Sequence, residues 1–217
     1  MSDSHPHKVL IDRLGTELVP VRRLPSPWQR TAGWLLAVAA IGALLLMHYG
    51  MHPMLRRWDG APDLAWAALG ALITAIGAAW AAFALGVPGR DVRWVLLPLP
   101  GALLWIGASG LGCLRTWLAP GTSIASLHEA THCLVFIVSF SIPLSALLIM
   151  LLRRAYPLRP MVTAILVGLA SAAASATLLN ICHEYDAAAT DLLTHAAAVA
   201  LVVAANAMMG GRLLSRG

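Results

Sequence analysis

Six long apolar runs constrain this 217-residue chain more than any other feature of its sequence. Each run is about as long as a helix that crosses a hydrocarbon core of roughly 30 Å, and none has an Asp, Glu, Lys or Arg in its interior. The runs occupy residues 31–48, 64–86, 94–113, 133–152, 161–182 and 191–211. The chain is only 12% charged, against about 25% in soluble domains. The sequence therefore predicts an all-α integral membrane protein, a bundle of six transmembrane helices.

The positions of the basic residues predict the orientation of this bundle. Twelve of the fifteen Lys and Arg residues lie in the two terminal segments and in the loops 86–93 and 153–160, which share one side of the membrane. Loops on the cytoplasmic side carry an excess of Lys and Arg. Both termini are therefore expected in the cytoplasm. The net charge of +5 is then a topology signal with some attraction to membrane lipid, and it does not indicate direct binding of nucleic acid.

Residues 1–30 form a polar segment ahead of the membrane domain, which is expected to comprise residues 31–217. Residues 9–19 are predicted to form a short amphipathic helix that ends at Pro20, and the stretch up to the first span is expected to be extended. One stripe of this helix is apolar and consists of Leu10, Ile11, Leu14 and Leu18. Such a stripe suits a helix that lies on the membrane surface, and it equally suits a helix that docks on a soluble partner.

The spans themselves offer little chemistry. Small residues recur every fourth position in the second span (Gly70, Thr74) and in the fifth (Gly168, Ala172), a pattern that lets helices approach closely. The polar candidates inside the spans are Asn180, His195 and Asn206. Ion-coupled transporters usually need charged groups at mid-membrane depth. A small membrane transporter is therefore a disfavoured alternative.

Polar chemistry gathers at the expected outer ends of the spans. Cys113 ends the third run, Cys133 begins the fourth and Cys182 ends the fifth. Around them lie His48, His52, His128, Glu129, His132, His183, Glu184, Asp186, Asp191 and His195. Cys, His and carboxylate groups together can ligate a metal ion, and thiols on an oxidising face can also form a disulfide. Both readings remain open for Cys133 and Cys182, each of which adjoins a histidine. Cys113 has no polar neighbour in sequence and is interpreted as packing.

The stretch His128-Glu129-Ala130-Thr131-His132 matches the H-E-x-x-H signature of zinc proteases. On a helix the two histidines would face one metal ion, and the glutamate would act as general base for a bound water. The motif is expected in an extramembrane loop, and a five-residue match is weak evidence by itself. A zinc-dependent membrane hydrolase is thus an alternative function.

Several stretches, in this order along nearly the whole chain, resemble one family. They are Leu10-Ile11-Asp12-Arg13-Leu14, Pro20-Val21-Arg22-Arg23-Leu24, Phe83-Ala84-Leu85-Gly86-Val87-Pro88-Gly89-Arg90, Gly112-Cys113-Leu114, Cys133-Leu134-Val135-Phe136 and Pro157-Leu158-Arg159-Pro160, followed by the stretch 183–195. The chain resembles the NrsF-type membrane anti-sigma factors, which are negative regulators of extracytoplasmic-function sigma factors.

This resemblance implies a multi-pass protein of the bacterial inner membrane without enzymatic activity and without a required cofactor. The N-terminal segment would hold the sigma factor through its apolar stripe, with Arg22 and Arg23 on acidic groups of the partner. Cys133 and Cys182 match the family's sensing residues, which would respond to metal or oxidative stress. The residues themselves, rather than the resemblance, suggest that a transient metal ion at the outer face would be held by ligands drawn from His128, His132, Cys133, Cys182, His183 and Glu184.

Overall fold

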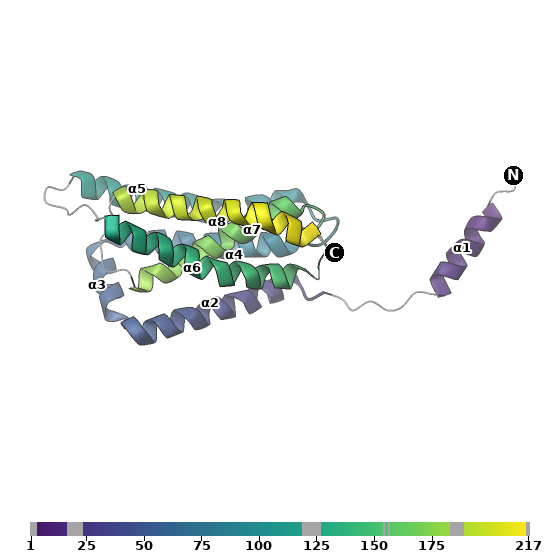
Figure 1. The fold of residues 1–217 in the computed structure, drawn as a ribbon, viewed down its shortest axis with the longest axis horizontal. Helices are drawn as coiled ribbons and strands as arrows, with labels where there is room; N and C mark the ends of the chain where they lie inside the picture. The colour runs from purple at the N-terminus through teal and green to yellow at the C-terminus, as the bar shows by residue number, and fades with distance from the viewer. Residues whose placement is uncertain are drawn as a thin grey trace.

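The chain, seen in a computed structural model, is helical almost throughout the part that the structure describes. That part comprises residues 4–16, 24–118, 127–153, 155, 157–182 and 189–215. Within it there are eight α-helices, one 3-10 helix and no strand. Figure 1 shows one elongated bundle, with the helix α1 (Ser4–Thr16) apart from it. The predicted all-α fold is confirmed.

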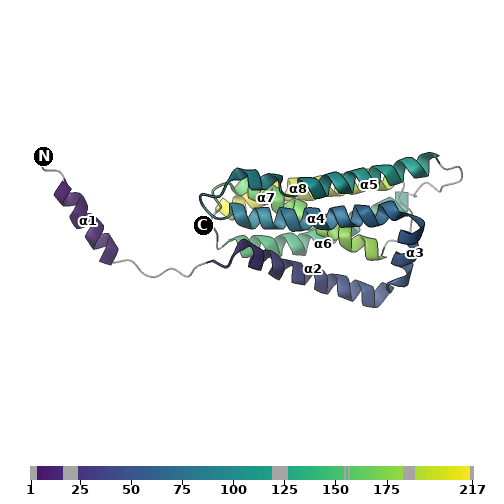
Figure 2. The same ribbon diagram turned by 180° about the vertical axis from the view of Figure 1, so that it is seen from behind.

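Six helices are long and apolar enough to cross a membrane, which confirms the predicted spans. They are α2 (Pro27–Tyr49), α4 (Pro62–Leu85), α5 (Leu99–Leu118), α6 (Leu127–Leu152), α7 (Pro160–Cys182) and α8 (Ala189–Ser215). The short helix α3 (His52–Gly60) follows α2, and the 3-10 helix η1 (Val92–Leu96) precedes α5. Successive spans alternate in direction (Figures 1 and 2). We call the end where α2 begins and α8 finishes the terminal end, and the opposite end, where α6 begins, the cysteine end.

The first span begins earlier than the sequence suggested. Pro27 was expected in extended chain, but it is the first residue of α2. The side chain of Ser26 accepts a hydrogen bond from the backbone N–H of Gln29, whose own side chain accepts one from the backbone N–H of Ser26. Proline is well tolerated at the first position of a helix, where its missing N–H has no partner to lose. As a result Arg30 lies inside the helix rather than in the polar segment before it.

The amphipathic N-terminal helix is present and is shifted toward the N-terminus. It spans Ser4–Thr16 instead of the expected 9–19, with Pro6 accommodated in its first turn. The apolar side chains Leu10, Ile11 and Leu14 are exposed, and so is Val9. Leu18, Arg22 and Arg23 lie outside the described residues. The bundle therefore does not cover the apolar stripe of α1.

The centre of the bundle consists of α4 and α7, which pack against each other and are the most buried of the spans. Helix α5 covers α4, α6 and α8 cover α7, and α2 touches both central helices (Figure 2). The buried residues of α4 and α7 are mostly Ala, Gly, Ser and Thr. In lipid, helices associate by close van der Waals contact rather than by a hydrophobic driving force, so small residues suit the central positions.

Two glycines on facing helices mark the closest approach of α4 and α5. A Cβ atom on Gly70 would lie 2.4 Å from the backbone nitrogen of Trp105, and one on Gly101 would lie 2.6 Å from that of Thr74. Helices α7 and α8 show the same closeness, since a Cβ on Gly168 would lie 2.8 Å from Cα of Val203. The predicted small-residue rows therefore lie at helix contacts.

Gly101→Ala should destabilise the bundle, because the added methyl group meets the backbone of α4, which cannot yield. Overpacking of this kind costs about 1–3 kcal/mol. We expect a lower melting temperature of the purified protein in detergent. Gly107→Ala on the same helix is the control, since nothing lies within 4 Å of its Cβ position. Equal melting temperatures for the two variants would contradict the packing described here.

Candidate functional site

The two predicted sensing thiols lie at the cysteine end, against the same apolar cluster. Cys133 is in the second turn of α6, and Cys182 is the last residue of α7. Cys133 is 4% exposed and packs with Ile137, Leu179 and Ala198, a cluster against which Cys182 also packs. All three cysteines of the chain are thiols, and Cys113 on α5 is outside this cluster. The structure therefore brings Cys133 and Cys182 to one site on two different helices.

The two thiols differ in environment. Cys133 is buried, whereas Cys182 is half-buried. The Sγ atom of Cys182 donates a hydrogen bond of 3.6 Å to the carbonyl oxygen of Leu179 in the preceding turn. A reagent from the membrane surface therefore meets Cys182 more readily than Cys133.

The predicted H-E-x-x-H motif is helical, and the expectation that it lies in a loop is wrong. Helix α6 begins at Leu127, one turn ahead of the apolar span that starts at Thr131. Leu, Glu and Ala in this turn are strong helix formers, which allows the span to continue outward. The His132 side chain is exposed, and those of His128 and Glu129 lie outside the described part.

Of the remaining metal-ligand candidates, His48 and His52 lie on the helices α2 and α3, and several others lie outside the described residues. His48 is exposed and packs edge-on against Tyr49, with 4.8 Å between ring centroids, and His52 begins α3. His183, Glu184 and Asp186 fall outside the described residues, as does the side chain of Asp191. Among the side chains that the structure does describe, no three His, Cys, Asp or Glu groups lie close enough to hold a metal ion.

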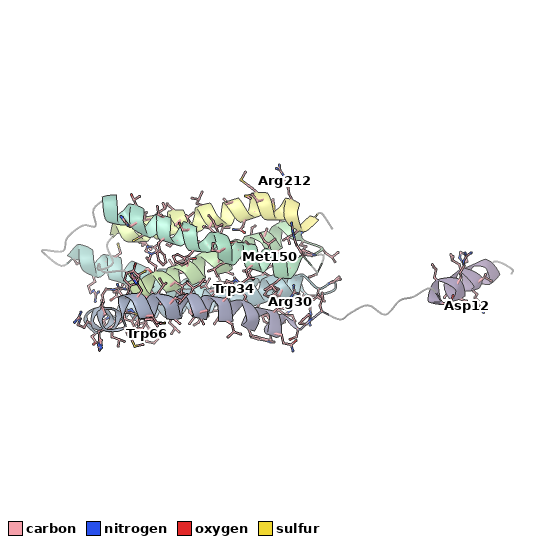
Figure 3. All side chains as sticks on the ribbon, turned by 60° about the horizontal axis from the view of Figure 1, so that its bottom comes forward. Asp12, Arg30, Trp34, Trp66, Met150 and Arg212 are labelled. Carbon is pink, nitrogen blue, oxygen red and sulfur yellow. The ribbon has the colours of Figure 1, made fainter. Side chains whose placement is uncertain are left out.

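At the terminal end a buried arginine joins three helices. Arg30 of α2 is 6% exposed, and its Nη2 donates a hydrogen bond to the carbonyl oxygen of Leu151 near the end of α6. Its guanidinium also lies 4.4 Å from the centre of the Phe83 ring on α4, a cation–π contact. Figure 3 labels Arg30 at the terminal end and Trp66 near the opposite end. The first span is thus held to α4 and α6 where it leaves the N-terminal segment.

Helix α6 also makes polar contacts along the interior of the bundle. Trp34 Nε1 of α2 donates to the Leu144 carbonyl oxygen at 3.2 Å. The hydroxyl of Ser141 donates to that of Ser175 on α7 at 3.1 Å, and Asn206 Nδ2 of α8 donates to the Ser145 hydroxyl at 3.1 Å. Each of these three contacts has one partner on α6. They tie α6 to α2, α7 and α8 between its cysteine and the Arg30 contact.

Comparison with known proteins identifies one family for this chain. The sequence model of the family described as "NrsF: Negative regulator of sigma F" matches residues 14–215 of the chain. The chain belongs to the NrsF family. No curated protein and no solved structure matches it. The NrsF match covers all six spans and begins within α1, so Leu14 lies inside it and Leu10 and Ile11 lie before it.

Membership of the NrsF family makes this membrane protein a negative regulator of a sigma factor. The prediction that the chain is not an enzyme is confirmed, which removes the zinc-hydrolase alternative. The family also favours a regulator over the transporter alternative, whose candidate Asn206 instead bridges α8 to α6 through Ser145.

The sequence did not predict that Arg30 and Arg57 make contacts between helices of this NrsF-family bundle. Arg57 of α3 donates through Nη2 to the Asn180 carbonyl oxygen of α7 at 3.1 Å. From the sequence, Arg30 was assigned to the polar segment before the first span and Arg57 to the loop 49–61. The signal that could have identified Arg30 is the Ser26-Pro27-Trp28-Gln29 stretch, a helix start that carries the arginine into the span.

Cys133 should react with a maleimide more slowly than Cys182 in the folded protein, by roughly tenfold or more, because burial limits access to the thiol. The measurement is the labelling rate of variants that keep one cysteine each, with the others changed to Ala. Labelling in denaturing detergent is the control, in which the two rates should converge. Equal rates in the folded protein would mean that Cys133 is not buried.

Proposed function

We propose that this protein is a bacterial inner-membrane anti-sigma factor with both termini in the cytoplasm. It binds an extracytoplasmic-function sigma factor through residues 1–30 and releases it when Cys133 and Cys182 react with a metal ion or an oxidant. The observation that carries the proposal is the exposed apolar stripe of α1, in a chain that belongs to a family of negative regulators of a sigma factor.

The exposure of this stripe supports a docking role. Leu10, Ile11 and Leu14 are 54–65% exposed, and Val9 at 67% widens the apolar surface. Burying apolar surface yields about 25 cal/mol per Å², so a groove on a partner would stabilise the helix. Leu18, Arg22 and Arg23 would extend the contact, the arginines facing acidic groups of the sigma factor.

The proposed orientation rests on the distribution of charge. Arg90, Arg93, Arg153, Arg159 and Arg212 all lie at or near the terminal end, where α4, α6 and α8 finish. The positive-inside rule puts this end in the cytoplasm. The cysteine end then faces the outer compartment, where metals and oxidants arrive.

The chemistry proposed at the cysteine end involves both thiols. A soft metal ion would be ligated by the two sulfurs with release of two protons. Alternatively, an oxidant would accept two electrons while the sulfurs form a disulfide and two protons leave. Either reaction draws the start of α6 toward the end of α7 and disturbs the packing of Ile137, Leu179 and Ala198.

Helix α6 is the proposed route from the cysteines to the sigma factor. It carries Cys133 near one end and the Leu151 carbonyl group that binds Arg30 near the other. A shift of α6 would alter the Arg30 contact at the start of α2, next to the N-terminal segment. The reacted state must bind the sigma factor more weakly for release to follow.

Leu10→Asp/Leu14→Asp in the full-length protein should abolish sigma-factor binding. Burial of a leucine side chain contributes about 1.5–3 kcal/mol to binding. Because about 1.4 kcal/mol corresponds to a tenfold change in affinity, loss of two leucines should weaken binding by about 100-fold or more. The measurement is recovery of a sigma factor, identified by mass spectrometry, with the tagged protein from a lysate of the source cells.

Gly15→Asp/Thr16→Asp is the matched control, because it changes the charge of α1 equally and leaves the apolar stripe intact. It should retain the sigma factor. If the wild type recovers no sigma factor, or if the leucine variant binds as well as the control, α1 is not the docking helix.

Cys133→Ala/Cys182→Ala and Arg30→Met should each keep the sigma factor bound when cells meet the metal or oxidant. Expression from a sigma-dependent promoter should fall to nearly its uninduced level, whereas repression without stress should be unchanged. Methionine keeps the length of the arginine, and replacing a buried charge by an apolar side chain is often tolerated. Arg153→Gln, an exposed arginine beside the same end of α6, should respond like wild type. Normal induction in the Arg30 variant would exclude the α6 route.

A further inference from the structure

A cavity of about 410 Å³ lies between the central helices and the pair α5 and α8, and α3 reaches it from the cysteine end. Its size falls within the range of about 300–1,000 Å³ found for small-molecule sites. Apolar side chains form most of the wall, whereas its polar groups are those of Arg57, Ser109, Asn180 and His195. The cavity is separate from the cysteine cluster, although Leu179 contributes to both.

The mouth of the cavity opens between α5 and α8. Ile106 of α5 and Ala196 and Ala200 of α8 line it and are exposed. These residues lie within the spans, so the solvent that they meet is the lipid bilayer. A molecule that enters by this route comes from the membrane.

The cavity is polar at one end and apolar along its length. Along α7 its wall runs from Asn180 to Leu169, about 16 Å at 1.5 Å per helical residue. One leaflet of a bilayer contributes about half of a hydrocarbon core of roughly 30 Å. The dimensions therefore match one acyl chain whose headgroup lies at the cysteine end.

The polar end is cationic. Among the described residues that line the cavity, Arg57 is the only Lys or Arg, and none is an Asp or Glu. Its Nη2 is oriented by the hydrogen bond to the Asn180 carbonyl oxygen. The planar guanidinium fork suits phosphate oxygens, and the half-buried His195 supplies a further polar group beside it.

We propose that this cavity binds an anionic phospholipid of the leaflet at the cysteine end, with the phosphate at Arg57 and one acyl chain along α7 and α8. Lipid is the molecule that the mouth faces, and the charge at the polar end selects an anionic headgroup. The site does not depend on how the cysteines sense their signal.

The test measures binding of phosphatidylglycerol to the purified full-length protein by native mass spectrometry and by melting temperature in detergent. We expect one tightly bound phosphatidylglycerol and a higher melting temperature than with phosphatidylcholine. Arg57→Gln should weaken phosphatidylglycerol binding at least about tenfold, since a hydrogen bond to a charged group is worth roughly 1.5–3 kcal/mol. Arg56→Gln is the matched control, because that neighbouring arginine is exposed and does not line the cavity, and it should bind like wild type.

Ala200→Trp provides a second variant that leaves Arg57 in place. The indole at the exposed mouth should exclude the acyl chain and lower binding to the level of Arg57→Gln, while the melting temperature without lipid stays close to that of wild type. Equal binding of the two lipids, or unchanged binding in both variants, would overturn the proposal. Tight binding of oleate in place of phosphatidylglycerol would also overturn it, in favour of a free fatty acid.

Discussion

The whole bundle depends on how closely α4 and α7 approach their neighbours. In lipid, no hydrophobic force presses these helices together, so their association rests on contact between backbones. Gly70 and Gly101 allow α4 to meet α5, and Gly168 allows α7 to meet α8. Larger side chains on the outer surfaces of α2, α5, α6 and α8 then face the bilayer. The central pair thereby determines where every other span, and with it every polar group, can lie.

Polar contacts within this apolar bundle converge on α6. It accepts hydrogen bonds from α2 and α8 and donates one from Ser141 to Ser175 of α7. Its two ends carry Cys133 and the Leu151 carbonyl group. A buried polar group that loses its partner costs free energy, so these contacts give α6 a defined position. A helix with few preferred positions can carry a displacement from one end of the bundle to the other.

Much of the fold could be predicted from the sequence, because a bilayer requires long apolar helices and their lengths are visible in the chain. The depth of Cys133 and Cys182 followed from their places at the ends of apolar runs. Their common cluster did not, since it depends on which helices are neighbours. Arg30 was assigned to the polar segment because its partners, Leu151 and Phe83, are more than fifty residues away. The start of α6 at Leu127 was missed because a polar turn on an apolar helix resembles a loop.

The separation of α1 from the bundle bears on how the protein can evolve. Substitutions at Gly101 or Gly168 change contacts between backbones, so the membrane helices can accept few of them. Substitutions at Leu10 or Ile11 change no contact within the bundle, because these side chains are exposed. Under the proposed function, only the sigma factor would constrain them. The proposed docking helix could then change together with its sigma factor while the membrane domain stays as it is, so that relatives with similar spans could bind different sigma factors.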